Sequence, residues 1–249
     1  GTAIHPRAAM FNQRTIEIYR GLGIEQDVVE AAQLEFEQDG AIVSVETLAG
    51  EDVTYFYRSF NEGVEALSPT SRLFITQIGL EPLLRERARE QGAEHRYGTE
   101  LASFTAGDDG VTAVLRDRDT GAEETVRADY LVAADGAHSP IRGQLGIGTA
   151  GRGSFADCVT IYFKADMREL IAGRPLSVVY VSHPELLGFF RFSFHGDSGF
   201  LAVFSTTDAD GNRDTHSARD LDAVGCVALV RKALGRHDIA VEVEDVQSW

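Results

Sequence analysis

Cysteine is scarce in this chain, with two residues, Cys158 and Cys226, among 249. Two cysteines are too few for a disulfide framework or for a cysteine zinc site. Both lie among apolar neighbours, so we interpret them as reduced side chains that pack in the interior. The seven histidines are scattered, and none stands three or four residues from another. A metal site on one face of a helix is therefore disfavoured.

Long apolar runs and basic residues are also in short supply. No run approaches the roughly 18 apolar residues of a spanning helix, and residues 1–6 lack the charged and apolar regions of a signal peptide. We therefore expect a cytoplasmic protein. Lysine and arginine number 23 against 39 acidic residues, which gives a net charge of −16. Such a surface repels phosphate backbones and anionic lipids, so we expect no nucleic-acid or membrane partner.

The chain does contain enough apolar residues for a core, at 43% of the sequence, and its length suits one or two domains. Helical spacing of apolar side chains and alternation of apolar with polar ones predict most of its elements. The predicted helices cover residues 9–22, 25–32, about 80–91 and 220–234. The predicted strands are an antiparallel pair at 41–45 and 54–57, a meander within 93–127, and four strands between 158 and 205.

Residues 130–134 differ from the other predicted strands because they are apolar without alternation. That pattern is typical of a parallel strand covered on both faces. The sequence therefore predicts an α/β part that contains this strand, joined to an α+β part.

Asp135 follows that strand and is the strongest candidate site residue. The Asp-Gly dipeptide occurs four times, and at Asp39, Asp109 and Asp210 we interpret it as a turn. Asp135 instead stands at the carboxyl end of the predicted buried strand, where open α/β sheets bind ligands. His138 and Arg142 follow within eight residues. A carboxylate, an imidazole and a guanidinium there would suit ribose hydroxyls, phosphates or a nicotinamide cofactor, although a simple turn remains the alternative.

Two other motifs are weaker. Residues 146–151 match the dinucleotide-binding glycine pattern, but no buried strand precedes them and no apolar helix follows, so they predict an interdomain turn. Ser198 is one residue short of a hydrolase nucleophile elbow and lacks its strand–turn–helix setting. A hairpin turn is the better interpretation there.

Residues 129–142 resemble the "DG" motif of the flavoprotein aromatic hydroxylases related to para-hydroxybenzoate hydroxylase. Three further stretches agree, in the order in which that family has them. Residues 5–17 look like the segment after the second strand of its flavin domain, and residues 77–84 look like the start of the helix that passes the flavin. Residues 151–206 are similar to the substrate domain of hydroxylases that act on aromatic polyketides. The resemblance covers nearly the whole chain.

The resemblance implies an α/β fold, α+β overall, in which an FAD/NAD(P)-binding Rossmann-like domain is interleaved with a β-sheet substrate domain. Residues 1–33 and 71–150 would belong to the flavin domain, and residues 34–70 and 151–249 to the substrate domain. The implied activity is monooxygenation with FAD, NAD(P)H and dioxygen, in which a hydroperoxide of the flavin oxidises an aromatic substrate. In this branch of the family the expected substrate is a polycyclic polyketide. The partner is then a small aromatic molecule, and the enzyme would be a monomer or a homodimer.

The family's cofactor residues carry over at six positions. Arg7 matches an arginine near the flavin phosphates, Gln77 a glutamine near the ribityl chain, and Leu101 the loop that meets the adenine. The aspartate of the DG motif, which supports the pyrophosphate region and the reduced cofactor, corresponds to Asp135. Positions associated with binding of the nicotinamide cofactor correspond to His138 and Arg142. No catalytic acid or base is implied, because the cofactor carries the oxidising oxygen.

Two cofactor motifs of the family are missing from the 249 residues. The glycine pattern that would precede Gly1 and the Gly-Asp motif that would follow Trp249 are not in the sequence. The sequence therefore predicts an internal fragment of a longer protein that would bind FAD weakly or not at all by itself. The alternatives are a simple phenol hydroxylase, an oxygen-inserting Baeyer–Villiger relative, and a non-catalytic remnant whose sheet binds an aromatic ligand.

The last alternative depends on the aromatic residues of the predicted sheet. They include Tyr162, Phe163, Tyr180, Phe189, Phe190 and Phe192. Alternate members of this set are expected to pack between the sheet and a helix.

Overall fold

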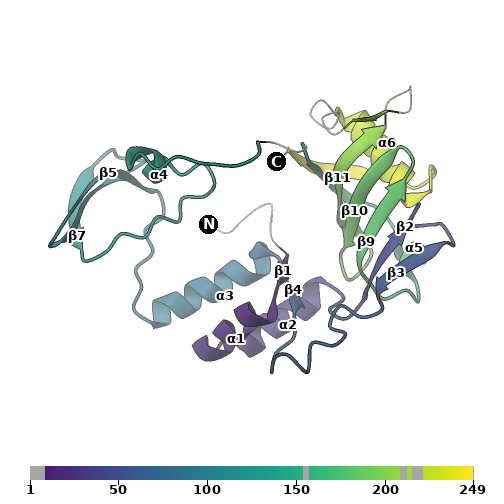
Figure 1. Cartoon of the computed structure of the whole chain (residues 1–249), viewed down its shortest axis with the longest axis horizontal. Helices are drawn as coiled ribbons and strands as arrows, with labels where there is room; N and C mark the ends of the chain where they lie inside the picture. The colour runs from purple at the N-terminus through teal and green to yellow at the C-terminus, as the bar shows by residue number, and fades with distance from the viewer. Residues whose placement is uncertain (1–8, 154–156, 208–211, 215–220, 249) are drawn as a thin grey trace. The chain divides into compact units, whose positions relative to one another are not determined.

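The computed structural model describes residues 9–153, 157–207, 212–214 and 221–248 (Figure 1). The chain forms two compact units, one made by residues 89–153 and the other by most of the remaining residues. Arg7, one of the predicted cofactor residues, lies outside the described residues. No helix in the described ranges is long and apolar enough to cross a membrane.

The larger unit is built around an eight-stranded sheet. Its path runs β13-β8-β11-β10-β9-β2-β3, and β12 pairs with β11. The strands are β2 (Ala41–Val45), β3 (Val53–Tyr57), β8 (Val159–Lys164), β9 (Leu176–His183), β10 (Leu186–Phe192), β11 (Ser198–Thr207), β12 (Arg213–Asp214) and β13 (Glu242–Ser248). Neighbouring strands are antiparallel except β2 and β9, which are parallel. The predicted pair at 41–45 and 54–57 is confirmed. The four predicted strands form the middle of the sheet, which continues with β13 beyond β8 and with β2 and β3 beyond β9.

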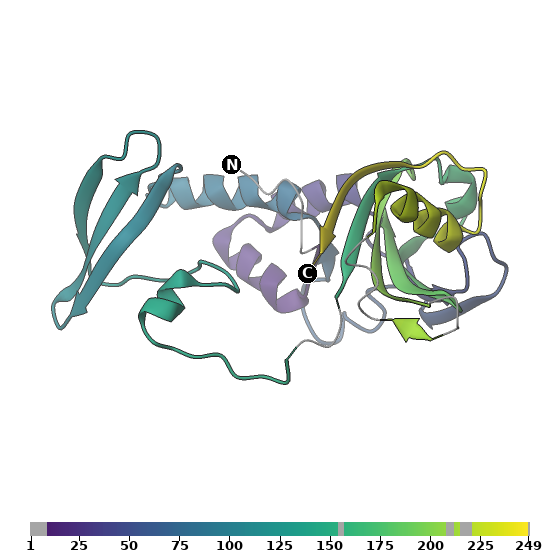
Figure 2. The same ribbon diagram turned by 90° about the horizontal axis from the view of Figure 1, so that it is seen from above.

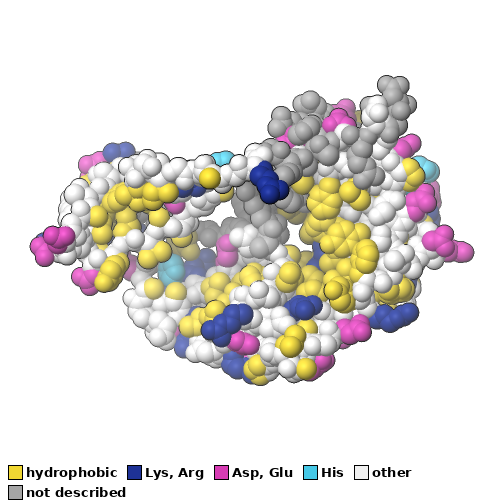
Figure 3. Space-filling model, in the orientation of Figure 1, with side chains coloured by type: hydrophobic (Ala, Val, Ile, Leu, Met, Phe, Trp, Pro, Cys, Tyr) yellow, Lys and Arg dark blue, Asp and Glu magenta, His cyan; other side chains and the backbone are white. Residues whose placement is uncertain are grey.

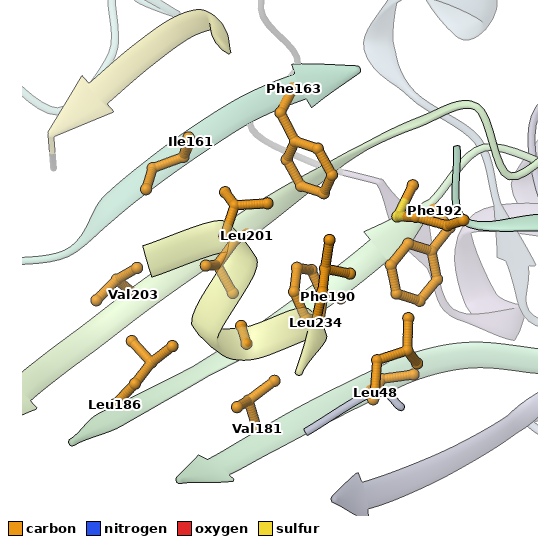
Figure 4. Close-up of a cluster of buried hydrophobic side chains, with 14 of the residues drawn as sticks. Leu48, Ile161, Phe163, Val181, Leu186, Phe190, Phe192, Leu201, Val203 and Leu234 are labelled. Carbon is orange, nitrogen blue, oxygen red and sulfur yellow. The ribbon is translucent and has the colours of Figure 1, made fainter. Parts of the chain in front are cut away.

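One face of this sheet is covered by α6 (Ala223–Leu234), the olive-yellow helix of Figure 2. Apolar side chains from the strands meet the helix in a continuous core that also contains Cys226. Figure 4 shows part of this core: Leu48, Ile161, Phe163, Val181, Leu186, Phe190, Phe192, Leu201, Val203 and Leu234. Three of the six sheet aromatics, Phe163, Phe190 and Phe192, are therefore packed between sheet and helix, as the alternation predicts.

Capping residues set the ends of α6. The Asp222 carboxylate accepts a hydrogen bond of 2.7 Å from the Gly225 backbone N–H, and Gly235 adopts φ +71° just after the last turn. Both are favoured solutions for the unpaired backbone groups at helix ends.

Replacing Asp222 with alanine should lower the free energy of unfolding by about 1 kcal/mol, because the first turn of α6 loses its side-chain acceptor. Asp222→Asn is the matched control, since asparagine also caps helices and should retain most of the stability. Urea denaturation of the two variants would check this. Equal losses from alanine and asparagine would mean that the cap contributes little.

Helices α1 (Gln13–Leu22), α2 (Glu25–Glu35) and α3 (Gln77–Glu90) belong to the same unit, with the short antiparallel pair β1 (Met10–Phe11) and β4 (Leu73–Phe74). A second core joins them: Ile16, Tyr19, Ile24, Val28, Ala32, Leu73, Ile75 and Leu80. The first helix begins later than predicted because Asn12 caps it by accepting from the Thr15 N–H at 3.2 Å, while the two residues before Asn12 pair with β4.

The smaller unit contains an antiparallel sheet of β5 (Thr99–Gly107), β6 (Gly110–Asp117) and β7 (Glu123–Ala128), and a short helix α4 (Pro140–Gln144). This confirms the predicted meander. The predicted buried strand at 130–134 is wrong for this structure: the segment belongs to no strand, and Tyr130 and Val132 are 87% and 86% exposed. A parallel strand needs a neighbour for its hydrogen bonds, and no described strand pairs with these residues.

Candidate functional site

The face of the large sheet opposite α6 carries a connected row of aromatic rings. Successive centroids are 5.7–6.0 Å apart along the series Phe56, Tyr180, Phe189, Phe200 and Tyr162, and Phe204 joins it at 5.7 Å from Phe189. These separations are typical of favourable aromatic pairs. In Figure 3, hydrophobic side chains gather over the strands of this sheet. Unlike the core rings, each member of the row is partly or largely exposed.

Strand alternation explains how the row arises. In β10 the side chains of Phe190 and Phe192 face α6, so Phe189 and Arg191 between them face the other way. Cross-strand register then places Phe189 opposite Tyr180 of β9. Arg191 likewise lies opposite Phe200 of β11, and Phe200 lies opposite Tyr162 of β8. Residues directly opposite each other lie on the same face, so these side chains form one surface.

Two cavities open along this aromatic face. The first, about 590 Å³, is lined by Tyr162, Arg191 and Phe200 from the sheet, and by residues of α2 and the start of α3. The second, about 580 Å³, is lined by residues of β2, β3, β9 and β10, among them Phe56 and Tyr180. Both volumes lie in the range of small-molecule sites, which is about 300–1,000 Å³.

The second cavity combines apolar walls with hydroxyl groups. The hydroxyls of Ser44 and Ser182 are 3.0 Å apart across β2 and β9, and both residues line the cavity together with Tyr57. A few polar groups among aromatic walls are typical of sites that orient a ring bearing oxygen substituents.

Arg191 is the principal charged residue buried at the first cavity, with 3% of its surface exposed. Its guanidinium carbon lies 3.5 Å from the ring centroid of Phe74 and 4.2 Å from that of Phe36. Burial lowers the pKa of Arg191 to about 9, and nearby Glu35 opposes that shift. Its Nε makes no hydrogen bond to any residue in the described ranges. Sequence reasoning missed Arg191, although a lone arginine within the run Gly188–Phe194 is a usable signal.

Of the predicted cofactor residues, Gln77 lies in the larger unit, as the first residue of α3. Its neighbours Thr76 and Ile78 line the first cavity. The amide Nε2 is 3.4 Å from Oε1 of Glu81, one turn further along the helix. An amide at a helix N-terminus both donates and accepts hydrogen bonds, which suits a chain of hydroxyl groups.

Leu101, Asp135, His138 and Arg142 lie in the smaller unit. Leu101 is half-buried in β5, whereas the other three belong to the loop and short helix after β7. The structure brings Asp135 and Arg142 together in one ordered loop: the Ile141 N–H donates to Asp135 at 3.1 Å, and the Arg142 guanidinium donates to the Ala137 carbonyl at 2.9 Å. His138 is exposed on this loop.

The donor set of this loop fits a ligand with hydroxyl and phosphate groups. Asp135 offers acceptor oxygens to hydroxyls, and Arg142 and His138 supply donors for anionic oxygens. Gly136 adopts φ +84°, which favours glycine, and no atom stands within 4 Å of where a Cβ would be. The loop therefore exposes its backbone beside these side chains, as close approach of a ligand requires.

A hydrogen bond from the Ser139 hydroxyl is the main reason why the pKa of Asp135 lies below its usual range, followed by the bond from the Ile141 N–H. Ser139→Ala should therefore raise that pKa toward the ordinary value. Because the pKa of Asp135 is lower in the folded chain than in the unfolded chain, its ionised carboxylate stabilises the loop at pH values above the unfolded pKa. This stabilisation is lost as the pH falls through the folded pKa. Carboxyl NMR titration would measure the change. Ser71→Ala, at an exposed serine of the larger unit, serves as the control. An unchanged Asp135 pKa in Ser139→Ala would contradict the prediction.

Comparisons with known proteins agree over the whole chain. A family model described as FAD binding domain matches residues 1–249. The 4-methyl-5-nitrocatechol 5-monooxygenase of Burkholderia sp is 48% identical over 250 residues, which cover all of this chain and 45% of that protein. Aklavinone 12-hydroxylase DnrF of Streptomyces peucetius is 36% identical over 252 residues, which cover all of this chain and 50% of that protein.

Solved structures give the same result. A ternary complex of aklavinone-11 hydroxylase with FAD and aklavinone matches with a TM-score of 0.85 and 34% identity, over all of this chain and 47% of that one. The flavin-dependent monooxygenase PieE, in complex with FAD and substrate, matches with a TM-score of 0.82 and 32% identity, over all of this chain and 43% of that one. The predicted family and fold class are confirmed. The chain spans about half the length of the curated relatives it matches.

Proposed function

Because the chain belongs to the FAD-binding domain family, we propose that it is part of a flavin-dependent monooxygenase that hydroxylates an aromatic ring with NAD(P)H and dioxygen. The aromatic face of the large sheet carries this proposal. Ring side chains from five strands form a continuous apolar surface beside two cavities of suitable size. A contiguous exposed apolar surface of this kind typically marks a site where a ligand or a partner binds.

The residues of this chain would bind the substrate, orient it and exclude water from around it. An aromatic ring would pack against Phe189 and Phe200, and the paired hydroxyls of Ser44 and Ser182 would contact its oxygen substituents. When bound, the flavin supplies the activated oxygen, and the protein contributes position and an apolar surrounding. The substrate would be a hydroxylated aromatic compound, with a polycyclic polyketide as our first choice and a simple phenol as the alternative.

Each predicted cofactor residue would contact a particular part of the cofactor. Gln77 would contact the ribityl chain, Leu101 the adenine, and Arg7 the phosphates. Asp135 would support the pyrophosphate region, while His138 and Arg142 would contact the nicotinamide cofactor. We further propose that residues 1–33 and 71–150 serve the flavin, and that residues 34–70 and 151–249 serve the substrate.

The protein expressed from its complete reading frame provides the test. It should show the visible absorption spectrum of bound flavin and oxidise NADPH or NADH slowly when alone. Members of a panel of phenols and polycyclic aromatic compounds should stimulate that oxidation. A protein that carries flavin but responds to no aromatic compound would refute the hydroxylase. A protein without flavin that still binds aromatic compounds would favour a non-catalytic binding role.

A further inference from the structure

The two edges of the large sheet differ in how they are protected. One edge is β13, which carries three carboxylates, those of Glu242, Glu244 and Asp245. Charged side chains on an edge strand discourage another strand from pairing with it. The other edge is β3, whose sequence Val-Thr-Tyr-Phe-Tyr contains no charged residue and no proline (Figure 1). In the part of the chain that the structure describes, no strand pairs with the outer side of β3.

The aromatic side chains of β3 are largely exposed. Tyr55, Phe56 and Tyr57 have 47%, 54% and 55% of their surface accessible to solvent. All five residues of the strand are of types that favour β structure. An exposed apolar edge strand is a template on which a further strand can pair through its backbone N–H and C=O groups. β3 is therefore a candidate interaction surface of the larger unit.

One irregularity interrupts β3. Tyr55 and Tyr57 pair with consecutive residues of β2, so Phe56 is the extra residue of a β-bulge. Bulges can protect an edge, but they also re-aim side chains. Here Phe56 and Tyr57 both line the second cavity, while residues 53–55 keep a regular pairing with β2. The bulge therefore accounts for the cavity wall and leaves the first part of the edge regular.

The charges that flank β3 indicate which strand would pair with it. Asp52 precedes the strand and Arg58 follows it, and both are exposed. The guanidinium carbon of Arg58 lies 4.8 Å from the ring centroid of Tyr55, which places this charge beside the strand. When two copies of β3 are aligned antiparallel with full overlap, Tyr55 stands opposite the partner's Tyr55, and Asp52 stands opposite the partner's Arg58. The ends of β3 are thus complementary in charge to a second copy of the same strand.

We propose that β3 is a self-association surface, at which two copies of this chain pair their β3 strands antiparallel about a two-fold axis at Tyr55. A two-fold axis brings the same surface of both copies together and closes the assembly at two. Backbone groups of the two edges supply the hydrogen bonds, and the pairs of Asp52 with the partner's Arg58 set the register. The partner's strand would then lie beside the second cavity, whose wall includes Phe56 and Tyr57.

This inference is independent of the proposed monooxygenase activity, because it requires neither flavin nor an aromatic substrate. A pair of five-residue strands is small compared with the interfaces of stable dimers. The association should therefore be reversible and should depend on protein concentration.

Charge reversal tests the pairing in the complete protein. Asp52→Arg gives a copy with arginine at both ends of β3, and Arg58→Asp gives a copy with aspartate at both ends. Each variant alone would oppose like charges twice, whereas a mixture of the two would restore two pairs of opposite charge. Glu46→Arg is the matched control, because Glu46 is an exposed acidic residue that follows β2 and lies outside the edge strand. Sedimentation velocity over a range of concentrations would give the dissociation constant of each dimer.

We expect the wild type and Glu46→Arg to dimerise with dissociation constants within about 2-fold of each other. Each of the two β3 variants should raise the dissociation constant by about 10-fold or more, because two attractive charge pairs become repulsive. The equimolar mixture should form a heterodimer with a dissociation constant within about 3-fold of that of the wild type. Circular dichroism would verify that the variants fold.

A complete protein that stays monomeric at every concentration would overturn the inference. A dimer indifferent to both β3 variants, or a mixture that associates no better than its components, would also overturn it. Assemblies that grow without limit would mean that the edge joins an unlike surface. Amide hydrogen exchange of residues 53–57 is a second measurement: protection should rise with protein concentration. Protection already present in the monomer would show that another part of the complete protein covers the edge.

Discussion

Replacement of Phe190 by alanine is expected to lower the free energy of unfolding by about 3–5 kcal/mol. Phe190 is fully buried between the sheet and α6. The centroid of its ring lies 5.2 Å from that of Phe192 and 6.1 Å from that of Phe163. Its removal leaves a cavity in the middle of the core, which the surrounding strands cannot close without losing their hydrogen bonds. Chemical denaturation followed by circular dichroism would measure the loss.

The neighbouring residue supplies the control for this prediction. Phe189 has the same side chain and lies on the same strand, but it faces away from α6 and is partly exposed. Phe189→Ala should therefore cost clearly less stability than Phe190→Ala. Equal costs would mean that both faces of β10 are packed to the same degree and that the aromatic face is not open.

Phe189→Ala is instead expected to weaken the binding of an aromatic ligand by about 10- to 100-fold. Phe189 contacts Tyr180, Phe200 and Phe204, so it stands at the centre of the ring series. Burial of a phenylalanine side chain against a ligand contributes about 1.5–3 kcal/mol, which corresponds to that range of affinity. Titration of the complete flavoprotein with a phenol that stimulates NADPH oxidation would give the dissociation constant.

A surface residue on the opposite side of the sheet is the control for ligand binding. Val224 lies on α6 and is 76% exposed, so Val224→Ala removes apolar surface from the far side of the unit. Its effect on ligand affinity should be within about 2-fold. If Phe189→Ala behaves like Val224→Ala, the aromatic face is not where the substrate binds.

Much of the fold could be predicted because local patterns and tertiary structure agree. The strand pair at 41–45 and 54–57, the meander and the helix before Gly235 all follow from alternation, turn residues and caps. The edge strand β13 was missed because its acidic sequence, Glu242–Ser248, has low strand propensity. Its pairing with β8 decides its structure, and local propensity cannot reveal such a partner.

The error at residues 130–134 has a related origin. An apolar run predicts burial, but burial requires neighbouring strands, and the described residues supply none. The sequence also could not show which of Phe189 and Phe190 is buried. Strand alternation predicts that the two side chains lie on opposite faces of the sheet, but only the position of α6 shows which face is covered. Arg191 escaped notice because its chemistry depends on burial under Phe36 and Phe74, which are remote in the sequence.

The most direct test of the proposed activity is mass spectrometry of the aromatic product formed under ¹⁸O-labelled dioxygen. The complete flavoprotein would be supplied with NADPH and with the phenol that stimulates its oxidation most strongly. A flavin-dependent hydroxylase predicts a product that carries one labelled oxygen atom, formed at a rate that falls in Phe189→Ala. NADPH oxidation that yields only hydrogen peroxide with every such substrate, and no labelled product, would contradict aromatic hydroxylation.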